Sequence, residues 1–433
     1  MFKYYLQLAA RSLQRNAVLT ALMVMAMGFG VASSMTTYSL FRAVSGDPIP
    51  WKSSKLFFPQ IDASGPLHRR DADEPNDVLT YVDAVALMQD HRARLQTALY
   101  PIKPTVTTSK RQRAIPGHAV YREFFPMLDI AFSYGAGWSA AEDEHHAMVA
   151  VISKGLNQRL FGGTNSVGKT IQLNARTYTV VGVLADWHPR PKFYDLANVE
   201  AFGADDQVFI PFTTAIDQQM ATAGGFGCSA PPRPGFAGTL TTTCYWIGYM
   251  VELDSAQEVE AYRAYLDHYA RDQQSAGRFG WPPDNRLHDL QAWMTYEKVV
   301  PPPTKVSLVV ALCLLLVCMV NTVGLLLAKF MTRYSDIAVR RAMGASRRAI
   351  AVQYCIESGV IGLVGGLLAL ALTWLGLSAM RHVLPTQIAI LAHLDFSLLW
   401  QTLCLAITAT VIAGLYPVWR ATHASPFLQL KED

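Results

Sequence analysis

The chain has 433 residues, and its composition is that of a protein in contact with lipid. Hydrophobic residues make up 51% of it and charged residues 16%, against about 25% charged residues in an ordinary soluble domain. The mean hydropathy is +0.18 and the formal net charge is +4. These values exclude a disordered chain, a collagen and a small disulfide scaffold, and the charge is too small to favour a nucleic-acid partner. A membrane protein with a large water-facing part is expected.

The N-terminal part of the chain predicts a membrane anchor. Residues 1–16 place apolar side chains at helical spacing and include three basic residues, so we expect a cytoplasmic helix in the membrane interface. A stretch without charges then runs from Ala17 to Phe41. It is too long for the apolar region of a signal peptide and therefore predicts an uncleaved first membrane span over residues 17–43.

Residues 44–303 predict one large extracytoplasmic domain of mixed helices and strands. Its two ends repeat the order strand, helix, strand, with the first unit at 55–62, 78–89 and 94–106 and the second at 245–254, 256–273 and 286–294. The two β-α-β units bracket an inserted lobe at about 120–212, with strands expected at 149–153, 170–173 and 177–183 and a helix at 154–161. The Gly-, Pro- and Thr-rich residues 213–243 are expected to form a loop.

Two cysteines, Cys228 and Cys244, belong to the external segment. A disulfide between them would close a ring of 17 residues and stabilise the domain by about 3 kcal/mol. Two free thiols are the alternative. The other four cysteines lie in or beside apolar stretches, where cysteine acts as a small hydrophobic residue.

Two motifs in the external segment resemble known binding sites. Residues 163–170, GTNSVGKT, match the phosphate-binding loop G-x-x-x-x-G-K-[ST]. That loop follows a strand and opens a helix, whereas here a helical pattern precedes the motif and a strand pattern follows it, so we expect a turn. Residues 142–146, EDEHH, lack the spacing of metal ligands on a helix, and we expect a solvated loop there. The sequence therefore predicts neither a bound cofactor nor a metal ion in this chain.

Three further apolar stretches complete the membrane part, and we expect spans at 304–330, 352–380 and 396–419. Basic residues are concentrated at the N-terminus and in the segment 331–351, which places both termini and that segment in the cytoplasm. Residues 381–395 would then form a short external loop and residues 420–433 a cytoplasmic tail. Inside the third span, Gly362 and Gly366 predict close helix packing. Glu357, at the cytoplasmic end of that span, predicts an ion pair with the basic segment at the membrane interface, and a functional carboxylate within the membrane is the alternative.

The cytoplasmic segments are too short to hold an enzyme, so energy or a signal would have to come from a separate partner. The loop after the second span offers the best contact, because a helix running out of that span would break at Gly344 and Ser346 would cap a new helix. Such an elbow fits a groove on a partner. A basic loop that only fixes membrane topology is the alternative.

Four regions of the chain resemble MacB/FtsX-type ABC transporter permeases. Residues 337–346, IAVRRAMGAS, resemble the family signature E-I-G-[IV]-R-[RK]-A-[LM]-G-A-[ST], with Asp336 in place of the first Glu. Asn321 falls where the family has an Asn late in the second span, and residues 414–421, GLYPVWRA, resemble its C-terminal ending. The external stretches around residues 124–183 look like the family's MacB-like periplasmic core domain. In that domain V-G-K-x-I is a turn, which accounts for the motif at 163–170.

The resemblance implies an α+β membrane protein with four transmembrane helices and a large mixed α/β extracytoplasmic domain between the first and second. It implies a permease subunit, not an enzyme, in the bacterial inner membrane, with ATP and Mg bound by a separate ABC ATPase. The elbow that docks on that ATPase would comprise Arg340, Arg341, Ala342, Met343, Gly344, Ala345 and Ser346.

By the same resemblance, two permeases, identical or paralogous, would assemble with two ATPases and membrane lipid, and a periplasmic adaptor protein is a further expected partner. ATP-driven closure would move the elbows, and the first two spans would carry that movement outward by mechanotransmission. The client would be a peptide, an antibiotic or another amphiphile. A lipoprotein-release or cell-wall-hydrolase-regulating permease of the same superfamily, and a ligand-sensing membrane receptor, are the alternatives.

Overall fold

The computed structural model describes residues 16–63, 65, 74–107, 112–282, 284–332, 339–340, 343–383 and 395–423. The chain divides into two compact units. One contains residues 47–299, and the other contains the segments before and after them. The interfacial helix expected over residues 1–16, most of the loop expected at 381–395 and most of the tail expected at 420–433 lie outside the described residues.

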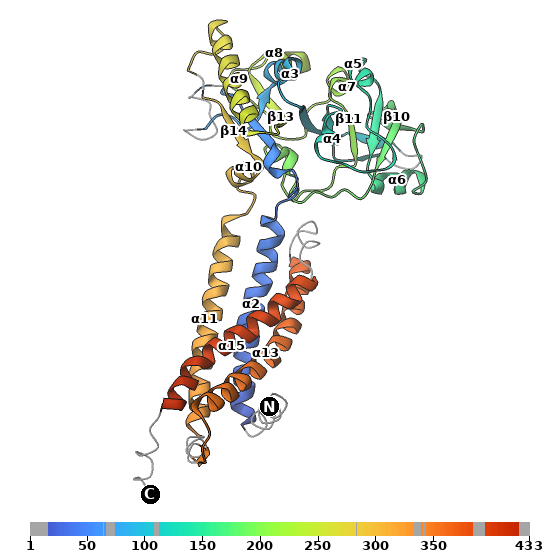
Figure 1. Cartoon of the computed structure of the whole chain (residues 1–433). Helices are drawn as coiled ribbons and strands as arrows, with labels where there is room; N and C mark the ends of the chain where they lie inside the picture. The colour runs from blue at the N-terminus through green and yellow to red at the C-terminus, as the bar shows by residue number, and fades with distance from the viewer. Residues whose placement is uncertain are drawn as a thin grey trace. The chain divides into compact units, whose positions relative to one another are not determined.

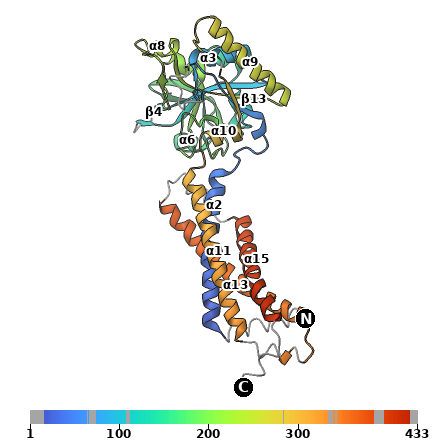
Figure 2. The ribbon, with the colours of Figure 1, turned by 90° about the vertical axis from the view of Figure 1, so that its left-hand side faces the viewer.

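The helical unit contains four long apolar helices, as the charge-free stretches predict. They are α2 (Ala17–Ser45), α11 (Pro302–Met331), α13 (Arg347–Val383) and α15 (Phe396–His423). By length and composition each can cross a membrane. Figures 1 and 2, which view the chain from directions 90° apart, both show the four helices side by side. Buried residues from all four helices meet in one cluster, among them Met27, Leu315, Ala369 and Ala406.

Two glycines let α13 and α15 approach closely, which confirms the packing predicted for them. A Cβ atom added at Gly362 would lie 2.9 Å from the carbonyl oxygen of Ala406, and one added at Gly366 would lie 3.1 Å from the Cβ of Ala406. Larger residues at these positions would push the helices apart. In lipid there is no hydrophobic driving force between helices, so the close van der Waals contact that these glycines allow stabilises the packing of α13 on α15.

The two predicted β-α-β units, one at each end of the external unit's sequence, pack together and form one part of it. The first contains β1 (Leu56–Gln60), α3 (Tyr81–Asp90) and β3 (Leu95–Ile102), and the second contains β13 (Cys244–Glu252), α9 (Ala256–Ser275) and β14 (Arg286–Asp289). The four strands form adjacent antiparallel pairs in the order β14-β1-β13-β3, which is the arrangement of a split β-α-β fold. Thr80 and Ser255 cap the two helices by accepting hydrogen bonds from Asp83 N and Glu258 N.

The inserted residues extend the same sheet beyond β3. The order continues β6-β11-β8-β10-β9-β4-β5, so the described strands form one 14-stranded sheet. These strands are β4 (Thr105–Thr107), β5 (Gln112–Ala114), β6 (Gly117–Val120), β8 (Val149–Ile152), β9 (Thr170–Leu173), β10 (Arg176–Leu184) and β11 (Val208–Pro211). Three short strands pair off this path: β2 (Leu79–Thr80), β7 (Phe132–Gly135) and β12 (Gly227–Cys228).

The sheet carries a core on each face because its strands are apolar on both sides. Tyr249 and Val251 of β13 belong to one core, which includes residues of α3 and α9. Met250, between them, belongs to the other, which includes residues of α10 (Leu290–Tyr296) and α4 (Phe124–Met127). Figure 1 shows α10 apart from α3 and α9 on this unit. Successive side chains of a strand point to opposite faces of the sheet, which places neighbouring residues of β13 in different cores.

Three sequence expectations for the external unit are wrong in detail. The expected loop at 213–243 holds α7 (Phe212–Asp217) and α8 (Phe236–Thr241), and the strand expected at 286–294 ends at Asp289, where α10 begins. The segment 142–146 begins inside the short helix α5 (Ala140–Glu144), whose N-terminus is closed by a capping box between Ser139 and Glu142. In each case a short helix takes the place of the expected loop or of the end of the expected strand.

The remaining structural expectations have clear outcomes. Cys228 and Cys244, for which the sequence left two possibilities open, are joined by a disulfide. The motif at 163–170 lies between α6 (Lys154–Phe161) and β9 and contains Gly168 at a φ of +83°. It is therefore a turn between a helix and a strand, as the inverted context predicts.

Candidate functional site

The elbow after the second span has the local geometry that the sequence predicts. Gly344 has a φ of +96°, a left-handed conformation that ends the preceding turn of helix. Ser346 then accepts a hydrogen bond from the backbone N–H of Ala349 over 3.2 Å at the start of α13. Of the proposed docking residues, Arg341 and Ala342 lie outside the described residues. The described part of the elbow therefore pairs a glycine stop with a serine cap.

Apolar side chains at the elbow are exposed. Met343 is 75% exposed and Val339 58% exposed, although both are large hydrophobic residues. Next to them, Arg340 donates a hydrogen bond to Gln353 over 3.0 Å and so fixes the turn to the first part of α13. Exposed apolar groups rimmed by polar ones are typical of a surface that contacts a partner.

A buried ion pair ties the end of α11 to α13. Lys329 Nζ lies 2.7 Å from Glu357 Oε1, and the two side chains are 0% and 2% exposed. The pair confirms the ion pair predicted for Glu357, but its burial differs from the interfacial position that the sequence indicated. Breaking such a pair is costly because one charge is then left buried without its counter-charge.

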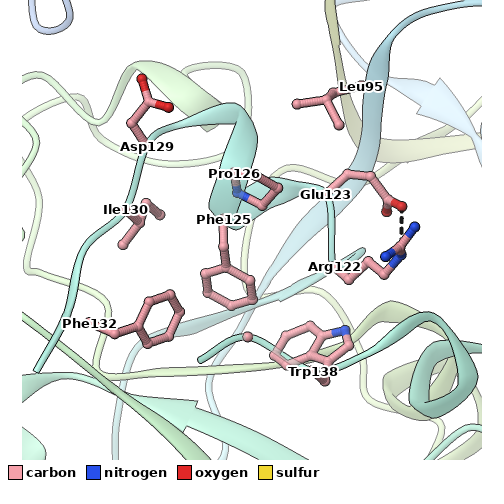
Figure 3. A pocket seen from close by; sticks show the side chains of 10 residues that line it. Leu95, Arg122, Glu123, Phe125, Pro126, Asp129, Ile130, Phe132 and Trp138 are labelled. Atoms are coloured by element: carbon pink, nitrogen blue, oxygen red, sulfur yellow. Dashed lines mark ion pairs between the residues drawn. The ribbon is translucent and has the colours of Figure 1, made fainter. Parts of the chain in front are cut away.

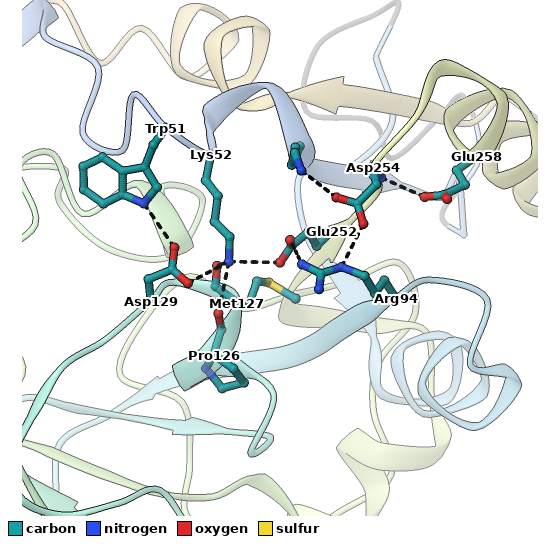
Figure 4. Close-up of polar contacts among 10 residues, drawn as sticks. Trp51, Lys52, Arg94, Pro126, Met127, Asp129, Glu252, Asp254 and Glu258 are labelled. Carbon is teal, nitrogen blue, oxygen red and sulfur yellow. Dashed lines mark hydrogen bonds and ion pairs between the residues drawn. The ribbon is translucent and has the colours of Figure 1, made fainter.

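In the external unit, the residues that follow α2 hold the end of α4. Lys52 Nζ donates to the carbonyl oxygens of Pro126 and Met127 over 3.1 and 2.9 Å and lies 3.0 Å from Asp129 Oδ1. Trp51 Nε1 donates to Asp129 Oδ2 over 3.1 Å (Figure 4). A cation at the last carbonyls of a helix is favourably placed. Four contacts therefore fasten the segment after the first span to one short helix and the turn behind it.

The same lysine also reaches a buried carboxylate of β13. Glu252 is fully buried, and its Oε2 lies 3.3 Å from Lys52 Nζ while Arg94 pairs with its other oxygen. Arg94 continues to Asp254 over 2.9 Å, and Asp254 pairs with Lys55 over 2.8 Å (Figure 4). The network, which comprises Lys52, Lys55, Arg94, Asp129, Glu252 and Asp254, is called here the root network. It joins the first residues of the external unit to β13, to the residue before β3 and to the turn after α4.

A cavity of about 370 Å³ lies beside α4. Phe125, Phe132 and Trp138 gather on one side of it, and Arg122 and Glu123 lie at another (Figure 3). The ring of Phe125 is 5.0 Å from that of Trp138 in an edge-to-face contact and 5.5 Å from that of Phe132. Pro126 and Asp129, which Lys52 contacts, line the same cavity. The root network therefore holds the wall of an aromatic cavity.

A second set of charges is wholly buried where β6 and the residues just before β11 meet the segment 192–195. His118 lies 3.0 Å from Asp195 and 2.9 Å from Asp206, and Lys192 lies 3.0 Å from Asp206, with every side chain at most 4% exposed. The hydroxyl of Tyr194 donates to Asp206. Burial by itself lowers the pKa of His118, but the carboxylates of Asp206 and Asp195 outweigh it and raise the pKa to about 9. The two carboxylates are thus balanced by two cations.

Sequence reasoning missed both the root network and the cavity. Lys52 and Glu252 are 200 positions apart, and no local pattern connects them. The aromatic residues of the cavity come from separate short segments, so the sequence alone does not distinguish them from residues of an apolar core. Within the described residues, no group of three or more His, Cys, Asp or Glu side chains converges as a metal site would require.

Comparisons with known proteins agree with this arrangement. The family described as MacB-like periplasmic core domain matches residues 20–269, and the FtsX-like permease C-terminal matches residues 308–426. The chain therefore belongs to the MacB/FtsX-type ABC transporter permeases. It is a multi-pass membrane protein of that class, with its large α/β domain between the first and second apolar helices.

Individual relatives are more distant. The macrolide export ATP-binding/permease protein MacB of Salmonella typhi is 23% identical over 310 residues, which cover 70% of this chain and 42% of the relative. MacB of Burkholderia cenocepacia is 25% identical over 331 residues, covering 75% and 43%. The chain thus spans less than half the length of these relatives.

The similar solved structures each cover just over half of the chain. The periplasmic region of MacB from Actinobacillus actinomycetemcomitans is 13% identical and has a TM-score of 0.38, covering 58% of this chain and 96% of that one. The extracellular domain of the noncanonic ABC-type transporter YknZ from Gram-positive bacteria is 14% identical, with a TM-score of 0.33, covering 51% and 94%.

Proposed function

We propose that this chain is the permease subunit of an ATP-driven exporter that works by mechanotransmission. The observation that carries the proposal is the position of the root network. α2 ends at Ser45, and Lys52, seven positions later, holds the wall of the aromatic cavity through Pro126, Met127 and Asp129. A displacement of α2 would therefore act on that wall through a short, hydrogen-bonded segment.

The inner end of the proposed relay is the elbow at residues 340–346. A separate ABC ATPase would dock on the exposed side chains of Val339 and Met343, and α13, which begins at Arg347, would move with the elbow. The buried pair of Lys329 and Glu357 would pass this movement to α11, which leads directly to the external unit. ATP and Mg would be bound by the ATPase and not by this chain.

The assembly would contain two permeases, as copies or paralogues, and two ATPases in the inner membrane, with both termini in the cytoplasm. Support for this orientation comes from the basic residues before α2 and between α11 and α13. A periplasmic adaptor is a further proposed partner. The client would be a peptide, an antibiotic or another amphiphile, because the cavity combines aromatic walls with charged residues at its edge.

The substitution Gly344→Arg tests the elbow. No L side chain adopts a φ of +96° without strain, so the arginine would distort the turn at the proposed docking surface. We expect affinity purification of the tagged full-length chain followed by mass spectrometry to recover an ABC ATPase with the native protein. The Gly344→Arg variant should insert into the membrane normally, lose the ATPase and abolish ATP-dependent client handling.

Gly277→Arg is the matched control, because Gly277 also has a positive φ, of +76°, and open space where a Cβ atom would lie, but belongs to the external unit. This variant should retain the ATPase. Recovery of the ATPase and normal client handling with Gly344→Arg would count against docking at the elbow. Absence of any ATPase from the native preparation would favour a receptor.

A further inference from the structure

The aromatic cavity shares two of its lining residues with a second cavity. The second has a volume of about 250 Å³ and is lined by residues of α3, α5 and the β6–α4 turn. The two cavities share Arg122 and Glu123, whose side chains form an ion pair of 2.8 Å between Nε and Oε1 (Figure 3). We name the two cavities together the α4 groove. Phe125, Phe132 and Trp138 line its aromatic end, and Glu123, Asp143 and Glu144 line its polar end.

The polar end has an excess of carboxylates. Glu123, Asp143 and Glu144 line it, whereas its cation is Arg122 and its two imidazoles are His91 and His146. His146 is engaged with Asp217, outside the cavity lining. Glu144 is exposed, so its carboxylate is accessible. A site with more acidic than basic groups attracts a cation and disfavours an anion.

One buried side chain connects the two ends of the groove. Asp143 accepts hydrogen bonds from Trp138 Nε1 and from the backbone N–H of Arg122, both over 2.8 Å. Trp138 belongs to the aromatic end, and Asp143 itself lines the polar end. The contact fixes the indole ring against Phe125 and so keeps the aromatic end open before a ligand arrives. Preorganisation of this kind lowers the cost of binding.

The Arg122–Glu123 pair between the two ends can be opened by a ligand. Arg122 is 47% exposed and Glu123 20% exposed, and exposed ion pairs contribute little to stability. A ligand cation can therefore take the place of the guanidinium beside Glu123 without breaking the fold. Its apolar part would then lie across α4 against Phe125 and Phe132, where edge-to-face contacts with an aromatic group are available.

We propose that the α4 groove binds a cationic amphiphile, in which an aromatic or large aliphatic group is joined by a short spacer to an ammonium or guanidinium group. This inference rests on the proposed function, because it names the class of client that the permease handles. A bound apolar group would rest on Phe125 and Pro126, and the carbonyl oxygen of Pro126 is held by Lys52. A ligand in the groove would thus shift the contacts of Lys52, in the segment that follows α2.

The test measures binding to the full-length chain in lipid nanodiscs, without ATP or any partner. Isothermal titration calorimetry would compare the amidated peptide Trp-Gly-Lys with its acidic analogue Trp-Gly-Glu and with 6-phenylhexylamine. We expect the basic peptide to bind roughly tenfold more tightly than the acidic one. Binding of the phenylalkylamine alone would assign the site to small amphiphiles, and binding of the basic peptide alone would assign it to peptides.

Two variants locate the site. Glu123→Gln/Glu144→Gln should weaken binding of the basic ligand by roughly tenfold, since it removes two carboxylates from the polar end. Phe132→Ala should weaken binding of Trp-Gly-Lys and of 6-phenylhexylamine, because it removes part of the aromatic wall. Glu260→Gln is the matched control, because Glu260 is 78% exposed on α9 and does not line the groove; it should leave affinity unchanged.

Equal affinity for the basic and acidic peptides, or no effect of the double variant, would overturn the inference. Neither result would affect the proposed coupling, which is tested by recovery of the ATPase with the native chain and its loss in Gly344→Arg. Conversely, loss of the ATPase interaction would not change ligand binding to the isolated chain. The two proposals can therefore fail separately.

Discussion

Single residues decide whether the external unit can hold four buried charges. His118, Lys192, Asp195 and Asp206 are almost inaccessible to water, yet two acids and two bases lie within 3.0 Å contacts. The charges cancel only while His118 is protonated. Because the pKa of His118 is raised to about 9, the balanced state persists at neutral pH, and the network stabilises the fold there.

Replacing this histidine should remove both stability and a part of its pH dependence. His118→Gln leaves the carboxylates with one cation fewer, so we expect the free energy of unfolding to fall by about 3–5 kcal/mol at pH 7. The pKa of His118 is about 9 in the folded chain and about 6.5 in the unfolded chain. Protonation of His118 therefore stabilises the fold fully below about pH 6.5, and this stabilisation is lost as the pH rises through about 9. The Tm of the native chain in detergent should therefore fall between about pH 7 and 10.

The same titration in variants separates His118 from other histidines. His118→Gln should lack the alkaline decrease in Tm. His288→Gln should retain it, because burial lowers the pKa of His288 and that side chain is already neutral in this range. A native Tm that stays constant up to about pH 10, or a His118→Gln variant as stable as the native chain at pH 7, contradicts the role of the network.

At the scale of elements, the long helices and the capped helix α6 could be predicted, whereas several short helices could not. The four apolar helices follow from stretches without charges, and α6 follows from Ser153, whose hydroxyl caps it by accepting from Leu156 N. α7 has six residues and follows Pro211, and α8 lies in a Gly- and Thr-rich stretch. Such helices are stabilised by packing against the sheet, which propensity does not report.

The candidate site divides in the same way. The elbow could be predicted because Gly344 and Ser346 act locally, by a positive φ and by a cap. The α4 groove could not, because Phe125, Phe132 and Trp138 come together only when α4, β7 and the turn before α5 have packed. Contacts between distant segments are set by topology and leave no periodic signal in the sequence.

The pair of Lys329 and Glu357 makes a testable connection between two elements. Lys329→Met removes the cation from beside a buried carboxylate, so we expect the free energy of unfolding in detergent to fall by about 3–5 kcal/mol. Glu357→Met should have a similar effect. The double variant Lys329→Met/Glu357→Met replaces the pair with apolar side chains and should recover most of the loss.

A double-mutant cycle on thermal unfolding reports this coupling directly. Lys305→Met is the control, because Lys305 belongs to the first turn of the same helix and forms no described ion pair. Additive effects of the two single substitutions would show that the pair does not link α11 to α13. A coupling energy above about 2 kcal/mol would support the link.

At the scale of the whole molecule, the proposed mechanotransmission predicts that a movement of the elbow between α11 and α13 changes the α4 groove in the external unit. The proposed path runs through a glycine turn, two helices that lead into the external unit, and the root network at Lys52. It requires no chemistry in the external unit. It does require that the groove report the nucleotide state of a separate ATPase.

The most direct measurement places an environment-sensitive fluorophore at Ala131→Cys, an exposed position between two groove residues, Ile130 and Phe132. The four free cysteines are replaced by Ala, and the chain is reconstituted with its co-purified ATPase. We expect ATP to change the emission in the native elbow background and to leave it unchanged in Gly344→Arg. In Lys52→Met the change should be reduced, whereas Lys154→Met, which removes an exposed lysine outside the root network, should respond like the native chain. An emission change of equal size in all four proteins, or none in the native background, would contradict the account.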